Sequence, residues 1–161
     1  MSGMMSYEQS REGAKLVGSR RQYATFYIGD LFFGIEVMKV QEVLRYLDMT
    51  RVPLAPTVIA GLINLRGQIV IAIDLRNRLG LESRPEGETP MNMVVRTEDS
   101  AVSLLVDEIG DVVDVTDETW EQPPDNMNKE RRELIEGIHK LPGQLLLVLS
   151  TERVLQTSFC N

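Results

Sequence analysis

The sequence predicts a mainly β protein built from two small barrels packed against each other, and three observations support this fold class. Residues 23–36 are rich in aromatic and β-branched side chains and are interrupted by Gly29-Asp30, which is typical of two strands joined by a tight turn. A second hairpin pattern occurs twice in the chain. Each copy carries five consecutive apolar residues, and a strand of this kind needs burial on both faces.

The repeated hairpin relates residues 61–79 to residues 137–155 at an offset of 76 positions. Gly61, Leu65, Gly67, Gln68 and Leu79 recur as Gly137, Leu141, Gly143, Gln144 and Leu155. The apolar blocks Ile69–Ile73 and Leu145–Leu149 coincide position by position. An internal repeat governs the architecture of a chain, and two packed barrels cover both faces of each block where one open sheet would not.

A weaker repeat places residues 34–43 on residues 103–112, at an offset of 69. The larger offset of the hairpins implies extra residues in the second copy, and we expect them between Pro123 and Glu136, where a proline-bearing loop precedes a charged helical turn. The polar segment from Glu82 to Pro90 is the expected boundary between lobes. The predicted division is an N-terminal arm at 1–22, one domain at 23–155 with lobe 1 at about 23–82 and lobe 2 at about 90–155, and a tail at 156–161.

After the first hairpin, apolar residues recur at helical spacing between polar ones: Val37, Val40, Val43 and Leu44. This spacing predicts a short amphipathic helix or a helical turn. Pro53 and Pro56 limit its length, since proline does not continue a helix.

The charge pattern excludes some classes of partner. The chain has 24 acidic and 17 basic residues, and ten acids but no Lys or Arg lie between Arg96 and Lys129. This balance argues against nucleic acid and anionic membrane surfaces. Cys160 is the only cysteine, and no apolar run has the length of a signal peptide or a membrane span. We therefore expect a cytoplasmic protein without membrane insertion.

Catalytic groups are scarce in this sequence. His139 is the only histidine, so Cys/His and Ser/His/Asp arrangements and a His-rich metal site are not expected. His139 aligns with Ile63 in the repeat, which predicts a half-buried strand residue. No glycine-rich phosphate loop is present. We expect no enzyme, no cofactor and no metal; a remote alternative is a small acid–base hydrolase using Asp74 with Asp107.

Arg66 distinguishes the two hairpin copies, because Asn64-Leu65-Arg66-Gly67 corresponds to Lys140-Leu141-Pro142-Gly143. A partly buried guanidinium needs a carboxylate or carbonyl partner, and Glu42 is the candidate. The pair could be purely structural or part of a binding surface, and the sequence leaves both open.

The chain resembles the CheW family of bacterial chemotaxis adaptors from about Tyr23 to Leu155. The matching segments are FGIEVMKVQEVL at 33–44, RVP at 51–53, GLINLRGQIVIAIDLRNRLG at 61–80, LLVDEIGDV at 104–112 and EGIHKLPGQLLLVL at 136–149. NLRG followed by an apolar strand and Asp74-Leu75-Arg76 is the most specific of these. Two features depart from the family pattern: Ser103 replaces a usual glycine, and Leu149-Ser150-Thr151 replaces an acidic strand end.

This resemblance implies two intertwined five-stranded barrels of SH3-like topology with short helices. It implies a non-catalytic adaptor, monomeric by itself, that binds the cytoplasmic tip of methyl-accepting chemoreceptors and the CheW-like regulatory domain of a CheA-type histidine kinase. By the same resemblance the receptor-binding residues are Val40, Glu42 and Arg66, and Asn64 and Gly61 are added because they lie on the same elements. For the kinase contact we expect a barrel end and exposed strand edges, with Thr50 and Leu54 as the candidates. An alternative is a CheW-like adaptor of another chemosensory kinase system, for surface motility or pili.

Overall fold

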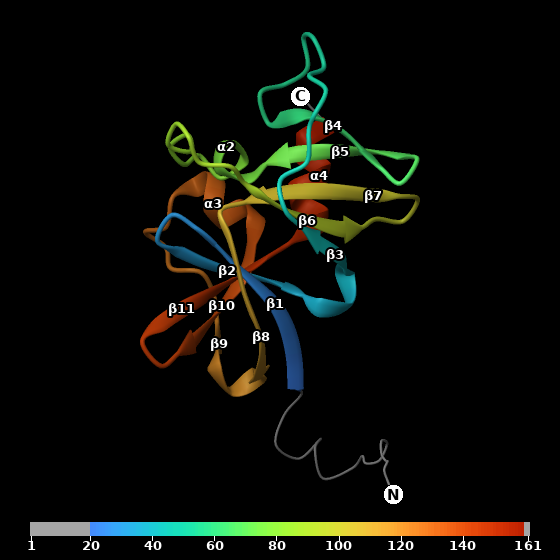
Figure 1. Cartoon of the computed structure of the whole chain (residues 1–161). Coiled ribbons are helices and arrows are strands. Elements are labelled where there is room, and N and C mark those ends of the chain that lie inside the picture. The colour runs from blue at the N-terminus through green and yellow to red at the C-terminus, as the bar shows by residue number, and fades with distance from the viewer. Residues whose placement is uncertain (1–19, 160–161) are drawn as a thin grey trace, which may run out of the picture.

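The computed structural model describes residues 20–159, with side chains described as far as Gln156. Two β-sheets face each other (Figure 1). Sheet A has the order β8 (Glu108–Thr116), β1 (Arg20–Ile28), β2 (Leu31–Glu36), β11 (Gln144–Leu149), β10 (Ile135–Leu141) and β9 (Trp120–Glu121). Sheet B has the order β3 (Val40–Leu44), β6 (Met91–Arg96), β7 (Ala101–Val106), β5 (Gln68–Asp74) and β4 (Ile59–Leu65).

The helices are short: η1 (Val37–Lys39), α2 (Leu75–Arg78), η2 (Asp117–Thr119), α3 (Lys129–Leu134) and α4 (Thr151–Phe159). The predicted fold class, mainly β with two barrels and short helices, is confirmed. Residues 20–22 of the predicted arm begin β1, while residues 1–19 lie outside the described residues. The predicted tail starts inside α4.

The hairpin repeat is confirmed in detail. The β4–β5 and β10–β11 hairpins carry the same bulge, between Ile59 and Gly61 in one copy and between Ile135 and Gly137 in the other. Both bulges need glycine, because a Cβ on Gly61 would lie 2.8 Å from the Thr50 carbonyl oxygen and one on Gly137 would lie 2.3 Å from the Trp120 ring. Close approach of this kind is a usual reason for glycine within a strand.

The parallel strand pairs confirm both repeat offsets. Ala72 of β5 lies opposite Ser103 of β7, and Val148 of β11 lies opposite Gly34 of β2. Ala72 and Val148 are related by the offset of 76, while Gly34 and Ser103 are related by the offset of 69. The two copies are therefore equivalent in three dimensions.

The two sheets are not the two halves of the chain. Sheet A joins β1 and β2 of the first copy to β8–β11 of the second, whereas sheet B joins β3–β5 of the first copy to β6 and β7 of the second. The chain crosses between sheets at η1 and at Asp107, so the barrels are intertwined. Residues 82–90 connect strands of the same sheet, because β5 before them and β6 after them both belong to sheet B. The division into lobes at 23–82 and 90–155 describes the two copies of the sequence repeat and stays a prediction.

The predicted helix around Val40 is wrong beyond its first turn. Val37–Lys39 forms the single turn η1, and Val40–Leu44 forms strand β3, which pairs with β6. A 3₁₀ turn has a period of three residues, and a bulge between Val40 and Glu42 interrupts the strand alternation. The turn and the bulge together space the apolar residues of this segment as a helix would.

The largest core cluster lies between the sheets. Its members include Phe26, Phe33 and Ile35 of sheet A and Ile73, Met93 and Leu104 of sheet B. The expected burial of the apolar blocks fails at the first residue of each, since Ile69 is 59% exposed and Leu145 is 45% exposed. The parallel partner strands begin pairing only at Ile71 and Leu147, so the start of each block is paired on one side alone, with the other strand of its own hairpin.

Candidate functional site

Strand β3 lies at one edge of sheet B and carries the first two predicted receptor-binding residues. Val40 is half-buried against the large core cluster, and its carbonyl oxygen accepts a hydrogen bond of 3.1 Å from Arg96 Nη1. Glu42 has a side chain that is 22% exposed. Val40 thus contributes to the core and also to the surface.

Arg66 lies at the β4–β5 turn with a left-handed backbone, at φ 53°, and it is followed by Gly67 at φ 89°. Two consecutive residues with positive φ are typical of the tight turns that suit the twist of a hairpin. Asn64 supports this turn, because its Oδ1 accepts a hydrogen bond of 2.9 Å from the Gly67 amide. The backbone therefore projects the Arg66 side chain into solvent, where it is 66% exposed.

Glu42 and Arg66 form the ion pair that the sequence predicted. Arg66 Nη2 donates to Glu42 Oε2, and Gln41 Nε2 donates to the same oxygen at 3.3 Å. The hydrogen bond from Arg66 lowers the pKa of Glu42 below its usual value. β3 and β4 are the two edges of sheet B, so this contact bridges the gap where the barrel closes. Exposed ion pairs contribute little to stability because water screens them, which favours a role in binding.

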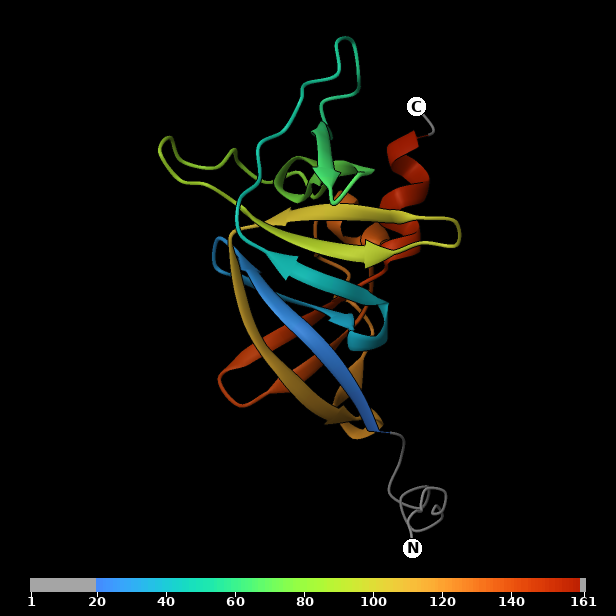
Figure 2. The ribbon, with the colours of Figure 1, turned by 45° about the vertical axis from the view of Figure 1, so that its right-hand side comes forward.

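The remaining predicted residues lie near the start of β4 and in the segment that precedes it. Gly61 is buried against Thr50, whose backbone exchanges hydrogen bonds of 2.9 and 2.8 Å with Leu62. Leu54 belongs to residues 45–58, a segment that protrudes from sheet B (Figure 2). Its side chain is fully exposed and its φ is 66°. The fold therefore brings Glu42, Asn64 and Arg66 together, links Gly61 to Thr50, and leaves Leu54 apart.

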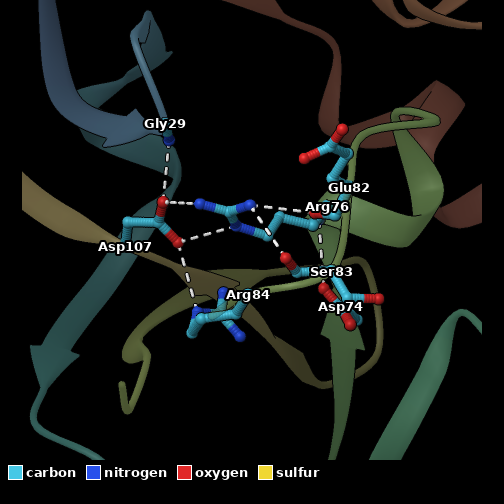
Figure 3. Close-up of polar contacts among 7 residues, drawn as sticks. All are labelled: Gly29, Asp74, Arg76, Glu82, Ser83, Arg84 and Asp107. Atoms are coloured by element: carbon cyan, nitrogen blue, oxygen red, sulfur yellow. Dashed lines mark hydrogen bonds and ion pairs between the residues drawn. The ribbon is translucent and has the colours of Figure 1, made fainter. Parts of the chain in front are cut away.

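A charged cluster that sequence reasoning missed lies at the edge of the inter-sheet core (Figure 3). Asp107 accepts hydrogen bonds from Arg76 Nε at 3.2 Å, Arg76 Nη2 at 2.5 Å, Arg84 Nε at 3.2 Å and the Gly29 amide at 2.7 Å. Asp107 belongs to the acidic stretch between Arg96 and Lys129, but its side chain is only 15% exposed. Arg76 in the Asp74-Leu75-Arg76 motif was the available signal.

The same contacts bear on the hydrolase alternative. Burial by itself raises the pKa of Asp107, but the hydrogen bonds from Arg76 and Gly29 and the charges of Arg76 and Arg84 outweigh burial and lower it. Asp74 caps α2 by accepting a 3.1 Å hydrogen bond from the Arg76 amide. A general acid needs a raised pKa, and Asp107 lacks that property.

His139 is fully buried rather than half-buried, which corrects the sequence-based expectation. Its Nδ1 lies 2.7 Å from Thr119 Oγ1, and its ring packs between Tyr23 and Trp120. Nε2 is buried without a hydrogen-bond partner among the described residues. Burial lowers the pKa of His139, so the neutral imidazole is favoured and the residue belongs to the core of sheet A's barrel.

The described residues contain neither a membrane-spanning helix nor a cluster of metal ligands. No helix between residues 20 and 159 is long and apolar enough to cross a bilayer. In the same part of the chain, no three His, Cys, Asp or Glu side chains are grouped so that they could hold a metal ion.

Comparison with known proteins agrees with this geometry. The model of the CheW-like domain matches residues 22–159. The chain belongs to the CheW-like domain family. It is 32% identical over 130 residues to the chemotaxis protein CheW of Bacillus subtilis, covering 81% of this chain and 83% of the relative. It is 30% identical over 146 residues to the chemotaxis protein CheW of Klebsiella aerogenes, covering 89% of this chain and 88% of the relative.

A solved structure extends the likeness to three dimensions. The scaffolding protein TtCheW of Thermoanaerobacter tengcongensis matches with a TM-score of 0.73 and 26% identity, over 82% of this chain and 90% of that one. The resemblance deduced from the sequence is thus confirmed, and the CheW family is one of chemotaxis scaffold proteins.

Proposed function

We propose that this CheW-like protein is a non-catalytic, cytoplasmic adaptor that couples a methyl-accepting chemoreceptor to a CheA-type histidine kinase. The observation that carries the proposal is the exposed contact between Glu42 and Arg66 beside the half-buried Val40. These residues come from separate parts of the chain and are the ones that the resemblance assigns to receptor binding. Their convergence where the two edges of sheet B meet supports a common surface.

The chemistry of this surface suits a helix from the receptor tip. An amphipathic helix binds through apolar anchors, while polar groups at the rim orient it. Val40 offers apolar surface, and Glu42, Arg66 and Asn64 offer both signs of charge and an amide. Asn64 also supports the turn, so we expect its substitution to act partly through the position of Arg66.

The kinase surface is proposed on the protruding segment 45–58, which contains Thr50 and Leu54. Leu54, Tyr46 and Val52 are exposed apolar residues of this segment, with exposed fractions of 104%, 40% and 38%. Exposed apolar patches mark interaction sites more often than single scattered residues do. Gly61 holds Thr50 in place through close packing against its backbone.

Binding measurements with three purified components test the proposal. Calorimetry would use this protein, a receptor cytoplasmic fragment and the regulatory domain of the kinase. We expect binding to each. With the full-length kinase in place of its regulatory domain, we expect autophosphorylation that depends on the receptor only when all three proteins are present. A protein that binds neither component would contradict the adaptor function.

The other CheW-like role, in surface motility or pili, involves the same kinds of partner. Deleting the gene and scoring swimming toward attractants against movement on surfaces would separate the two. Loss of surface movement with normal swimming would favour the alternative.

A further inference from the structure

Asp107 occupies a special position in the fold. It is the one residue between β7, which ends at Val106 in sheet B, and β8, which begins at Glu108 in sheet A. Its amide donates a 3.0 Å hydrogen bond to the Tyr27 carbonyl of sheet A. The chain crosses between the sheets here and at η1, so Asp107 belongs to one of the two covalent connections between them within residues 20–159.

The carboxylate of Asp107 ties several segments to this crossing, as Figure 3 shows. It accepts from the Gly29 amide in the β1–β2 turn of sheet A, and from Arg76 of α2 and Arg84 of the 82–90 connection. Arg76 Nη1 in turn donates to the carbonyl oxygens of Glu82 at 2.9 Å and Ser83 at 3.4 Å. We call Gly29, Arg76, Arg84 and Asp107 the clasp.

Burial makes these contacts strong. The side chains of Arg76 and Arg84 are each 12% exposed, and charged hydrogen bonds strengthen as water is excluded. One carboxylate faces two guanidinium groups, and Arg84 Nη2 is buried with no hydrogen-bond partner among the described residues. Removal of the Asp107 charge would leave two buried cations without their shared anion.

The internal repeat supplies a comparison within the same molecule. By the offsets of 76 and 69, α2 corresponds to the start of α4, the Gly29 turn corresponds to the β6–β7 turn, and Asp107 corresponds to the η1 region. The equivalent place holds no buried carboxylate–arginine cluster among the described side chains. A groove of about 800 Å³ is found there, lined by residues that include Lys39, Arg96, Glu152 and Leu155.

The two ends of the inter-sheet core therefore differ. The β1–β2 turn and η1 lie on opposite sides of the molecule in both views (Figures 1 and 2). The clasp closes one side. On the other side, Arg96 Nη1 donates to the carbonyls of Met38 at 3.0 Å and Val40 at 3.1 Å, beside the open groove and at the start of β3. The strand with Val40 and Glu42 thus begins at the side that no buried charge cluster holds.

We propose that Asp107 is a positioning residue for receptor binding, because the clasp sets the angle between the sheets and so the position of β3, which η1 joins to sheet A, relative to the β4–β5 turn that carries Arg66. This inference rests on the proposed adaptor function. Asp107 touches no partner in this scheme. It acts through η1 and β3 at the far side of a core that links both sheets, since packed cores transmit small shifts.

The test uses Asp107→Asn in the full chain, with Asp125→Asn as the matched control. Asp125 also pairs with an arginine, Arg132 at 3.0 Å, but its side chain is fully exposed. Spin labels at Glu98→Cys in sheet B's β6–β7 turn and Glu118→Cys in η2, in a Cys160→Ser background, report the distance between the two sheets by pulsed electron resonance.

We expect Asp107→Asn to broaden the distance distribution and to weaken binding of the receptor fragment about tenfold, with kinase affinity changed by no more than about twofold. Adding Arg84→Gln to Asp107→Asn removes the excess cation and should restore part of the receptor affinity. Asp125→Asn should match wild type in all measurements. Were Asp107→Asn not to fold, Arg84→Gln alone, which keeps the Arg76 pair, should show a smaller broadening and a smaller loss of receptor affinity.

An unchanged distance distribution and receptor affinity in the folded variant would overturn the proposal. So would equal losses for receptor and kinase without rescue, because they would indicate general destabilisation. Absence of receptor binding by the wild-type protein would instead contradict the proposed function. In that case the distance distributions would still show whether the clasp sets the angle between the sheets.

Discussion

The β4–β5 and β10–β11 hairpins have the same backbone plan and different surroundings. Both have the bulge before their glycine and both add a parallel strand to a hairpin of the other copy. Their turns differ, with exposed Arg66 in one and Pro142 in the other, and Ile63 in one core corresponds to His139 in the other. The shared features determine the fold, while the differences lie where binding or titration can occur.

Among the substitutions that test this comparison, Gly137→Ala should lower the free energy of unfolding most. Its Cβ would lie 2.3 Å from Cζ2 of the Trp120 ring, so the ring must move, and we expect a loss of about 3 kcal/mol in the free energy of unfolding. Urea denaturation followed by tryptophan fluorescence measures it. Gly87→Ala, where φ is 90° but no atom lies within 4 Å, should cost only about 1 kcal/mol. Equal costs would contradict steric contact as the cause.

Gly61→Ala is the matched change in the first hairpin. The new Cβ would lie 2.8 Å from the Thr50 carbonyl oxygen, and the backbone bridge between Thr50 and Leu62 should open at a cost of about 2 kcal/mol. Hydrogen exchange should accelerate at the Leu62 amide more than at amides of β10. Uniform acceleration through both sheets would contradict a local bridge.

His139 should make the stability of the protein depend on pH. Burial lowers its pKa in the folded state, so below about pH 6.5 the unfolded chain binds a proton that the folded chain refuses. The contribution of His139 to the free energy of unfolding is fully present above that pH. It decreases as the pH falls through and below that value, by at most about 1.4 kcal/mol per pH unit.

His139→Ile, which introduces the residue found in the first copy, should remove this part of the pH dependence. Thermal melting from pH 5 to pH 8 measures the effect in both proteins. Asp117 and Arg21 also influence His139, in opposite directions. Identical slopes in wild type and variant would assign the pH dependence to other groups.

Arg66→Ala should have the smallest effect on folding. The second hairpin forms without an arginine, and the Arg66 side chain is mostly exposed, so we expect Tm to change by no more than about 2 °C. Receptor-dependent control of the kinase should fall about tenfold. Lys140→Ala is the control, because Lys140 forms an exposed ion pair of 3.2 Å with Glu121 in the other copy. A large drop in Tm with normal kinase control would make the Glu42–Arg66 pair structural.

Much of the local structure could be predicted from the sequence. Gly29, Gly67 and Gly143 marked turns because glycine adopts positive φ at little cost, and the apolar blocks marked strands. The Glu42–Arg66 contact was also predicted, since it followed from chemistry and proximity along one copy. The helix expected at Val40–Leu44 failed because a bulge and a 3₁₀ turn together produced a misleading period.

The sequence by itself determined that two equivalent units exist, where their hairpins turn and that Arg66 belongs to only one of them. These features are local or repetitive, so they appear in the order of residues. Only the tertiary structure decided that the units exchange hairpins between sheets, and that Asp107, Arg76 and Arg84 meet at a crossing. Such contacts join segments far apart in the chain, and burial, which no local pattern records, gives them their strength.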